Sequence, residues 1–293
     1  MTVPAEARVA APGARTDAPP LRVALVQLAV VDGEPEANAA RAAALVRAAP
    51  AADLYLLPEL FTTGYAHARW ASAAREQTPA AVALLQALAD ERGAWVGGSA
   101  VAEVEGGGLA NRFYLCAPAG AAPGAAGALG APPTTYDKAH LFPPMGEPGR
   151  LTAGARRVRA CVGRGVGAAD TALSVCFDLR FPEQYRLDAA EGATLFACVA
   201  EWPHPRGETL RLLARARAAE NQAWLALCNR AGPAADGTVF CGGSCVVAPD
   251  GTVVADAGEA PDAVVVAEVD VGVAHRARAT LPVLPLRVAG VDS

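Results

Sequence analysis

The feature that most limits the possible folds is a regular alternation of apolar runs with helical segments. The runs LRVALVQLAV (21–30) and ADLYLLPEL (52–60) are almost continuously apolar, so they predict strands that are buried on both faces. Between them, EPEANAARAAALVRAAP (34–50) has helical spacing, with acidic residues in its first turn and a proline at its end. This order favours a sheet that is covered by helices.

The same order of elements continues through most of the chain. Further helices are predicted at 78–94, 182–192 and 206–222, and further strands at 94–101, 171–179, 193–200, 223–230 and 263–270. One hairpin is predicted to pair 111–118 with 134–141, and a second is predicted to turn at Asp250-Gly251. No change in composition divides residues 21–270, so we predict one α/β domain with mixed strand directions.

Two segments of biased composition interrupt this order. Residues 1–20 are rich in Ala and Pro and lack the apolar core of a secretion signal, so they predict a disordered N-terminal tail. The Gly/Ala/Pro-rich stretch 118–134 predicts a floppy loop between two strands. The residues after Asp270 show no clear pattern. We therefore expect a tail over 1–20 and one domain over 21–293.

Composition and charge narrow the possible functions. Apolar residues make up 53% of the 293 residues, which is enough for a sizeable core. The net charge of −5, without a basic block, argues against nucleic acid and against an anionic membrane as partners. No apolar run approaches the ~20 residues of a membrane span, and without an export signal we expect a cytoplasmic protein.

The seven cysteines predict reduced thiols rather than disulfides or a metal site. Their number is odd, no C-x-x-C pair occurs, and Cys241 and Cys245 lack histidines at zinc-site spacing. We expect most of them to pack as small hydrophobic residues. The four histidines also lack ligand spacing, and G-x-G-x-x-G is absent, so neither a metal nor a nucleotide cofactor is expected.

Three reactive side chains stand at the ends of predicted strands, which is where the active sites of α/β proteins gather. Glu59 follows ADLYLLP, Lys138 stands late in TTYDKAHL, and Cys176 stands late in TALSVCFDL. Lys138 is the only lysine, because the 25 basic residues comprise 25 − 1 = 24 arginines. Arginine serves a solvated charge equally well, so a lone lysine indicates a site that needs a compact ammonium group.

Taken singly, each of these residues has a plainer explanation. A cysteine in a buried strand is usually inert packing, a glutamate after a strand is often a surface acid, and a lysine is normally solvated. Together they form a known chemistry, in which a thiolate attacks a carbonyl carbon, a carboxylate moves the proton and an ammonium stabilises the oxyanion. The backbone N–H of Phe177, directly after Cys176, is expected to assist the ammonium.

The strings around these residues resemble the nitrilase superfamily, the carbon–nitrogen hydrolases. Its Glu–Lys–Cys triad matches LLPELFTTGY, YDKAHLF and SVCFDLRFPE, and further strings follow in family order: VALVQLAV, GRLTAG, ARAAENQAW, NRAG and GGSCVVAPDGTVVADAG. The resemblance covers about 22–270 and implies a four-layer α-β-β-α sandwich that forms a homodimer or a higher homo-oligomer. It also implies a second acid, Glu147, that orients Lys138 and assists the proton transfers, and it implies no cofactor.

Within the superfamily, CFDLRFPE is most similar to the ω-amidase branch, which releases ammonia from the terminal amide of 2-oxo acids. A small-molecule amide, hydrolysed through a thioester on Cys176, is therefore the expected substrate. The residues expected to line the substrate site are Tyr65, Phe177, Glu201 and Trp202. Relatives usually carry Asn where this chain has Glu201, and a carboxylate there would repel an anionic oxo acid unless it is paired or turned away.

Other functions stay open at this point. An N-carbamoyl amine or an aliphatic amide would use the same triad, and Leu210, where many relatives carry Trp, leaves the ω-amide in question. A catalytically silent scaffold, a thiol-redox or metal protein, and an acyltransferase are rivals, although the triad is complete and membrane spans are lacking. Arg180 is expected to pair with Asp178 or Glu183 rather than with a substrate.

Overall fold

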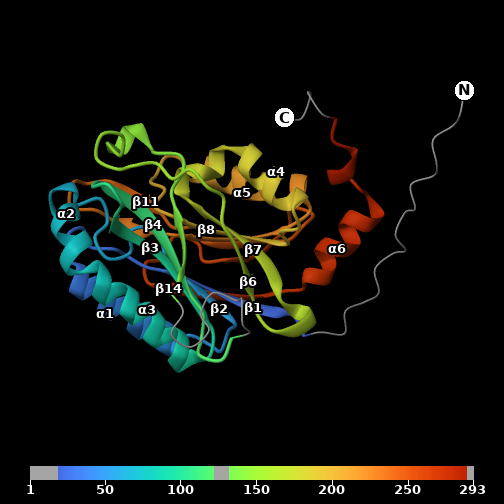
Figure 1. Cartoon of the computed structure of the whole chain (residues 1–293), viewed down its shortest axis with the longest axis horizontal. Coiled ribbons are helices and arrows are strands. Elements are labelled where there is room, and N and C mark those ends of the chain that lie inside the picture. Colours follow the sequence, from blue (N-terminus) through green and yellow to red (C-terminus); the bar gives the residue numbers. More distant parts are fainter. Residues whose placement is uncertain (1–18, 122–131, 289–293) are drawn as a thin grey trace, which may run out of the picture.

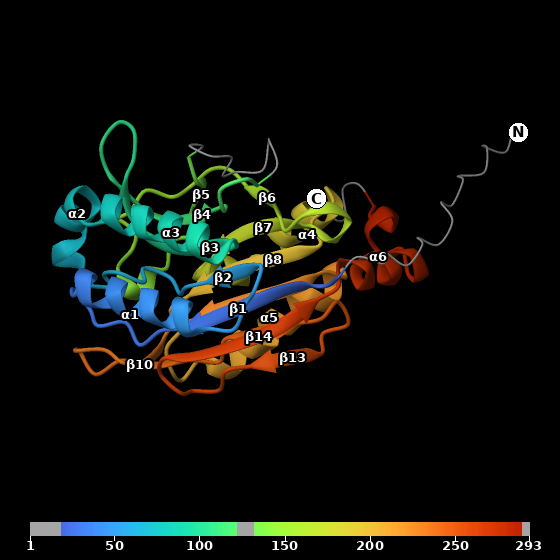
Figure 2. The ribbon, with the colours of Figure 1, turned by 90° about the horizontal axis from the view of Figure 1, so that it is seen from below.

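Two six-stranded sheets pack against each other, and helices cover the outer face of each sheet (Figure 1). The computed structural model describes residues 19–121 and 132–288. Nearly all of the predicted N-terminal tail and most of the predicted loop 118–134 therefore lie outside the described residues. The predicted four-layer α-β-β-α sandwich is confirmed by the order of helices and sheets (Figures 1 and 2).

The first sheet has the strand order β14-β1-β2-β3-β4-β5. Its parallel centre consists of β1 (Leu21–Gln27), β2 (Leu54–Leu56) and β3 (Trp95–Glu103), and its antiparallel strands are β4 (Leu109–Cys116), β5 (Thr134–Asp137) and β14 (Ala263–Val269). Helices α1 (Pro35–Ala48) and α3 (Thr78–Arg92) cover its outer face (Figure 2). Val23 and Leu25 pack between the sheets, whereas Ala24 and Val26 pack on the helix side, so β1 is buried on both faces as predicted.

The second sheet has the strand order β13-β12-β9-β8-β7-β6. Its parallel strands are β7 (Ala169–Val175), β8 (Leu195–Ala200) and β9 (Trp224–Asn229), and its antiparallel strands are β6 (Arg159–Val162), β12 (Cys245–Val247) and β13 (Val253–Asp256). Helices α4 (Pro182–Ala190) and α5 (Gly207–Asn221) form the outer layer (Figure 1). Both predicted hairpins are confirmed, since β4 pairs with β5 and β12 pairs with β13 in antiparallel register.

Several elements carry no strong sequence signal and were not predicted. They are α2 (His67–Glu76), α6 (Val271–Thr280), β6, and the short pair β10 (Ala231–Pro233) and β11 (Val239–Cys241). The start of α6 does have a local cause, because the Asp270 carboxylate accepts a hydrogen bond from the Gly272 N–H at 2.8 Å. The short strands are too brief to show a period of two.

Three predicted strands end earlier than expected. β2 ends at Leu56 rather than at residue 60, β5 ends at Asp137 rather than at residue 141, and β7 ends at Val175 rather than at residue 179. After β2 and β7 the chain stays largely buried, so an apolar run does not distinguish a strand from the buried turn that follows it. After β5 only Lys138 is fully buried, and the next three residues are partly exposed. Each candidate catalytic residue therefore follows its strand instead of lying within it.

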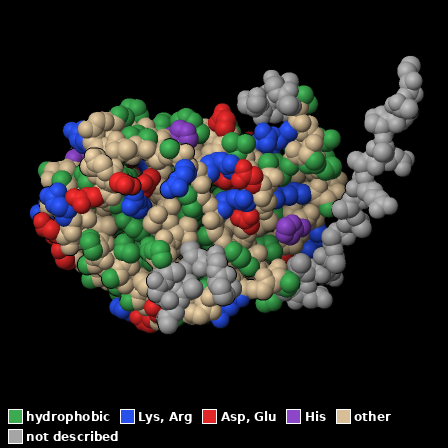
Figure 3. Space-filling model, viewed as in Figure 1, with side chains coloured by type: hydrophobic (Ala, Val, Ile, Leu, Met, Phe, Trp, Pro, Cys, Tyr) green, Lys and Arg blue, Asp and Glu red, His purple; other side chains and the backbone are tan. Residues whose placement is uncertain are grey.

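The first and last strands of the described chain pair with each other, and the surface shown in Figure 3 is charged. Seven residue pairs join β1 to β14, so the last strand of the described chain forms one edge of the first sheet. On the face shown in Figure 3, acidic and basic side chains are interspersed over the surface. In residues 19–121 and 132–288, no helix has the length and hydropathy that a membrane crossing requires.

Candidate active site

Glu59 stands in a buried turn directly after β2. The N–H of Leu57 donates to the Gly97 carbonyl at 2.7 Å, and the N–H of Leu60 donates to Ser99 Oγ at 2.9 Å. These bonds attach the turn to β3 on both sides of Glu59. Its side chain is fully buried, which excludes the surface acid that a glutamate after a strand often is.

Lys138 continues the line of β5 by one residue. Its N–H donates to the Asn111 carbonyl of β4 at 2.9 Å, and its own carbonyl accepts from the Gly154 N–H at 2.9 Å. The backbone is thus held on both sides. The side chain is fully buried, so this lysine is not a solvated charge.

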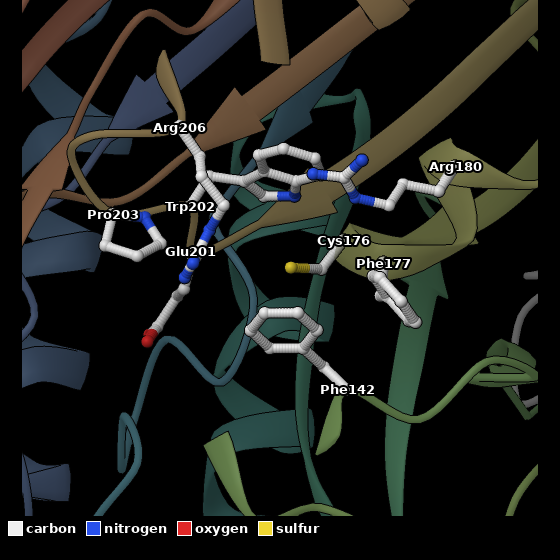
Figure 4. A pocket seen from close by; sticks show the side chains of 8 residues that line it. All are labelled: Phe142, Cys176, Phe177, Arg180, Glu201, Trp202, Pro203 and Arg206. Atoms are coloured by element: carbon white, nitrogen blue, oxygen red, sulfur yellow. The ribbon is translucent and has the colours of Figure 1, made fainter. Parts of the chain in front are cut away.

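Cys176 is the first residue of the turn Cys176–Arg180, which joins β7 to α4. Its φ of +53° lies in the left-handed region that residues other than glycine seldom adopt. Such backbone strain persists only where the surrounding structure enforces it, and it gathers at functional sites. The sequence prediction placed Cys176 inside a strand, whereas the sharp turn directs its side chain into a cavity instead (Figure 4).

Asp178 ties this turn to the segment that carries the lysine. Its Oδ2 accepts from the Val175 N–H at 2.8 Å and from the Tyr136 hydroxyl at 2.7 Å. Its Oδ1 accepts from the His140 N–H at 3.0 Å. Tyr136 and His140 stand on either side of Lys138 in the chain, so one buried carboxylate aligns two segments from different sheets.

The Lys138 ammonium lies between two buried carboxylates. Its Nζ is 2.8 Å from Glu59 Oε1 and 2.7 Å from Glu147 Oε1, and none of the three side chains is exposed. The Cys176 thiol lies close enough to the Glu59 carboxylate for each group to shift the pKa of the other. The structure thus brings the three predicted triad residues and the predicted second acid into one cluster.

Further donors hold the two carboxylates in place. Glu59 Oε1 also accepts from Asn111 Nδ2 at 2.7 Å and from the Tyr65 hydroxyl at 3.3 Å, and its Oε2 accepts from the Glu201 N–H at 3.0 Å. Glu147 Oε1 accepts from the Tyr65 hydroxyl at 2.8 Å, and its Oε2 accepts from the backbone N–H of residue 142 at 2.6 Å. Several donors per carboxylate fix the positions of both acids.

Burial and mutual charge set the protonation of the cluster. Burial raises the pKa of the Glu59 carboxyl, while the Lys138 ammonium acts in the opposite direction. Burial also raises the pKa of the Cys176 thiol well above its usual value, and the Glu59 carboxylate raises it further. For Lys138, burial is the largest single effect and opposes the charge, but Glu59, Cys176 and Glu147 together outweigh it and the pKa is raised. At neutral pH the lysine is therefore charged, and the thiol needs a base, which Glu59 can be.

Glu201 is paired from behind the cavity by Arg230. The Arg230 guanidinium donates to Glu201 Oε2 at 3.1 Å and to Asp32 Oδ1 at 2.7 Å, and the Glu201 and Arg230 side chains are both fully buried. The concern that an unpaired carboxylate would stand beside the pocket is thereby answered. Arg230 was not singled out from the sequence, because its partners lie 29 and 198 residues away.

A cavity with about 250 Å³ of empty space opens above the cysteine. It is lined by Phe142, Cys176, Phe177, Arg180, Glu201, Trp202, Pro203 and Arg206 (Figure 4). The Cys176 sulfur points into the space between the Trp202 indole and the Phe142 ring. Aromatic walls around one sulfur atom suit a small substrate whose acyl carbon must approach that atom.

The two arginines of the cavity wall are held by aromatic rings. The Arg180 guanidinium lies 5.0 Å from the centre of the Trp202 ring, and the Arg206 guanidinium lies 5.2 Å from the centre of the Phe142 ring. The predicted pairing of Arg180 with Asp178 or Glu183 is wrong. Among the described residues Arg180 makes no ion pair with either acid, since the oxygens of Asp178 are taken by groups of the turn and of the lysine segment.

The four predicted substrate-site residues fall into two groups. Phe177, Glu201 and Trp202 line the cavity, as expected. Tyr65 does not line it; its hydroxyl instead bonds to the two carboxylates beside Lys138. Its position six residues after Glu59 suggested a pocket residue. Buried carboxylates need hydrogen-bond donors, however, and the Tyr65 hydroxyl supplies one.

Besides Arg230, sequence reasoning missed Asn111, Phe142 and Arg206. Asn111 had a usable signal, because an asparagine inside a strand is uncommon and demands a hydrogen-bonding reason. Phe142 and Arg206 had none, since an aromatic residue after a strand and an arginine before a helix are ordinary. In the described part of the chain, no group of three His, Cys, Asp or Glu side chains is placed to hold a metal ion.

The four-layer sandwich and its buried glutamate–lysine–cysteine cluster define this protein as a hydrolase. The chain belongs to the carbon–nitrogen hydrolase family, whose sequence model matches residues 22–279. It is similar to a 2-oxoglutaramate amidase of Bacillus subtilis, with 32% identity over 265 residues that cover 89% of this chain and 95% of the relative. It is also 34% identical to an ω-amidase of Escherichia coli over 82% of this chain and 86% of the relative.

The solved structures agree with this assignment. A CN-hydrolase superfamily protein from Xanthomonas campestris, with an arsenic adduct in its active site, superimposes with a TM-score of 0.81 and 30% identity. The superposition covers 92% of this chain and 98% of the other chain. The nitrilase-superfamily fold and the hydrolysis of amide C–N bonds that the sequence predicts are thereby confirmed.

Proposed function

We propose that this hydrolase releases ammonia from the terminal amide of a small carboxylic acid, with the ω-amide of a 2-oxo acid as its best substrate. The observation that carries the proposal is that one cavity is lined by the Cys176 nucleophile and by two cations, Arg180 and Arg206. A cation on the wall binds the substrate carboxylate while the amide reaches the sulfur. The names of the two amidase relatives support the same substrate class.

In the first half of the proposed reaction, Glu59 removes the proton of the Cys176 thiol, and the thiolate attacks the amide carbon. The carbonyl oxygen becomes an oxyanion, which the Lys138 ammonium and the Phe177 N–H stabilise. The N–H groups at the start of a helical turn have no partner within the turn, which leaves the Phe177 N–H available. The C–N bond breaks, the nitrogen takes the proton from Glu59, and ammonia leaves.

In the second half, water hydrolyses the thioester. Glu59 removes a proton from water, the hydroxide attacks the acyl carbon, and the same two donors hold the second oxyanion. The C–S bond breaks, and the proton on Glu59 returns to the sulfur. The carboxylic acid product leaves, and the enzyme regains its first state.

The proposed role of Glu147 is to hold Lys138 in position and keep it charged through the proton transfers. Its two oxygens accept from Lys138, Tyr65 and a backbone N–H, all within 2.8 Å. A second carboxylate keeps the lysine protonated and holds its ammonium beside the reacting carbon. Tyr65 contributes by bridging Glu147 and Glu59.

The test is ammonia release from a panel of amides by the purified protein and by Cys176→Ser. We expect activity on 2-oxoglutaramate and on succinamate, weaker activity on a neutral aliphatic amide, and a loss of about 10³-fold or more in Cys176→Ser. Cys161→Ser is the matched control, because Cys161 is exposed and belongs to the edge strand β6.

Two outcomes would contradict the proposal. Full activity in Cys176→Ser would show that Cys176 is not the nucleophile. Ammonia release from only an N-carbamoyl amino acid or only a neutral amide would show that the proposed substrate class is wrong. The homo-oligomeric state and the cytoplasmic location expected from the sequence remain predictions.

A further inference from the structure

The Glu201 carboxyl group has an oxygen atom that the protein does not use. Glu201 lines the cavity above Cys176, and its side chain is fully buried. Its Oε2 accepts a hydrogen bond from Arg230, but its Oε1 is buried and has no hydrogen-bond partner within the described residues. Buried polar atoms are almost always satisfied, so an idle oxygen on a cavity wall indicates a partner that arrives with a ligand.

A comparison of the buried acids shows which one differs. The oxygens of Glu59 accept four hydrogen bonds from donors on Tyr65, Asn111, Lys138 and the backbone, and those of Glu147 accept three. Those of Glu201 accept one. Many donors around an acid stabilise its ionised form, whereas a single donor leaves one oxygen free to carry a proton.

The charges around Glu201 also favour a retained proton. Burial raises the pKa of its carboxyl group well above the usual value; Arg230 opposes this, and the Glu59 and Asp32 carboxylates reinforce it. The Tyr65 hydroxyl faces the same region. Four carboxyl groups, those of Glu59, Glu147, Glu201 and Asp32, surround only two buried cations, those of Lys138 and Arg230. A buried excess of negative charge is costly, and one proton reduces it.

We propose that Glu201 is a neutral carboxylic acid in the working enzyme and that its Oε1–H donates a hydrogen bond to an oxygen atom of the bound substrate. Glu201 is thus a specificity-determining residue for the amidase activity proposed above, on which this inference rests. The substrate class is a small amide whose acyl chain carries a hydrogen-bond acceptor, such as a 2-oxo group or a carboxylate. An ammonium group at the same place would meet a donor and two arginines of the cavity wall, so 2-amino acid amides are disfavoured.

Matched substrates and matched variants test this assignment. 2-Oxoglutaramate and glutamine share one skeleton and differ in the group at carbon 2, an acceptor in the first and a donor in the second. We expect the wild-type enzyme to prefer 2-oxoglutaramate. In Glu201→Leu we expect the KM for 2-oxoglutaramate to be about tenfold higher than in the wild type, with a smaller change in kcat. Glu201→Gln keeps an acceptor for Arg230 and a neutral donor, so it should restore most of that loss.

The pH dependence separates a neutral acid from a structural role. Ionisation of Glu201 at high pH removes the donor and places a charge beside an anionic substrate, so the wild-type KM should rise with pH. In Glu201→Gln this rise should be absent. Glu268→Gln, a change at an exposed acid, is the control and should keep the wild-type profile.

A third measurement needs no activity. The infrared difference spectrum between wild type and Glu201→Gln should contain the carbonyl band of a protonated carboxyl group at neutral pH, provided that both proteins melt cooperatively. A missing band, or a wild-type KM rise that persists in Glu201→Gln, would overturn the inference. If the wild type hydrolysed no carboxylate-bearing amide, the proposed function would fail, and the band would still decide the protonation of Glu201.

Discussion

Lys138 illustrates how one residue type satisfies a site that no other residue can. Its ammonium lies within 2.8 Å of two carboxylates, and its side chain has no exposed surface. A guanidinium is larger and planar, and it would fork onto one carboxylate instead of facing a developing oxyanion. The bias toward arginine in this chain therefore stops at the one position where the geometry requires lysine.

At this scale we predict that Lys138→Arg lowers kcat/KM by roughly 10²–10³-fold, the usual effect of losing an oxyanion donor. The measurement is the steady-state hydrolysis of the preferred amide, together with a thermal melt. Arg47→Lys, a change within the exposed pair of Arg47 and Glu91, serves as the control and should alter neither activity nor melting notably. If Lys138→Arg kept wild-type activity, the oxyanion role of the lysine would be wrong.

At the scale of elements, the end of β5 depends on how closely the irregular segment GRLTAG (149–154) approaches it. Gly154 donates its N–H to the Lys138 carbonyl at 2.9 Å. A Cβ atom at Gly154 would stand 2.0 Å from the Asp137 carbonyl oxygen. A backbone atom cannot move aside as a side chain does, so only glycine permits the approach that positions Lys138.

We predict that Gly154→Ala destabilises the fold by about 1–3 kcal/mol and lowers kcat/KM at least about tenfold, because the lysine segment must shift. Denaturant unfolding and steady-state kinetics measure the two effects. Gly207→Ala, at the start of α5, meets only ordinary contacts at 3.4 Å or more and is the matched control. Equal behaviour of the two variants would show that the close approach is unimportant.

At the scale of the whole molecule, the two sheets divide the work of the site. Glu59, Lys138 and Glu147 belong to the first sheet and its connections, whereas Cys176 and Glu201 follow β7 and β8 of the second sheet. The packing of both sheets buries six of the seven cysteines and leaves Cys161 exposed. Burial raises the pKa of Cys116, Cys198 and Cys245 to about 12 each, which suppresses their thiolate forms.

We therefore predict that an aromatic disulfide reagent at neutral pH modifies one thiol of the native protein rapidly, at Cys161, without loss of activity. The other six thiols are buried, and burial raises the pKa of the Cys176 thiol among them. They should therefore react only slowly, or only after unfolding. The measurement is the time course of reagent release. A rapid phase that survives in Cys161→Ser would contradict the packing of the sheets described above.

Much of this protein follows from local patterns in the chain. The apolar runs predict the central strands, because burial on both faces of a sheet demands continuous apolar residues whatever the topology. The identities of Glu59, Lys138 and Cys176 are likewise readable, since each stands in a short string with a chemical reason for its residue type, whereas Glu147 follows only from the family resemblance. The ends of β2 and β7 were not readable, because the buried turns after them are largely as apolar as the strands they follow.

Long-range contacts decided the rest. Asn111 donates to Glu59 across 52 residues, Glu201 accepts a hydrogen bond from an arginine 29 residues away, and the Tyr65 hydroxyl bonds to two acids instead of lining the cavity. Arg180 lies over an indole rather than beside the acid two residues before it. The strength of a polar contact depends on the distance between the groups and on the local dielectric constant. Both are fixed only once the two sheets have packed together.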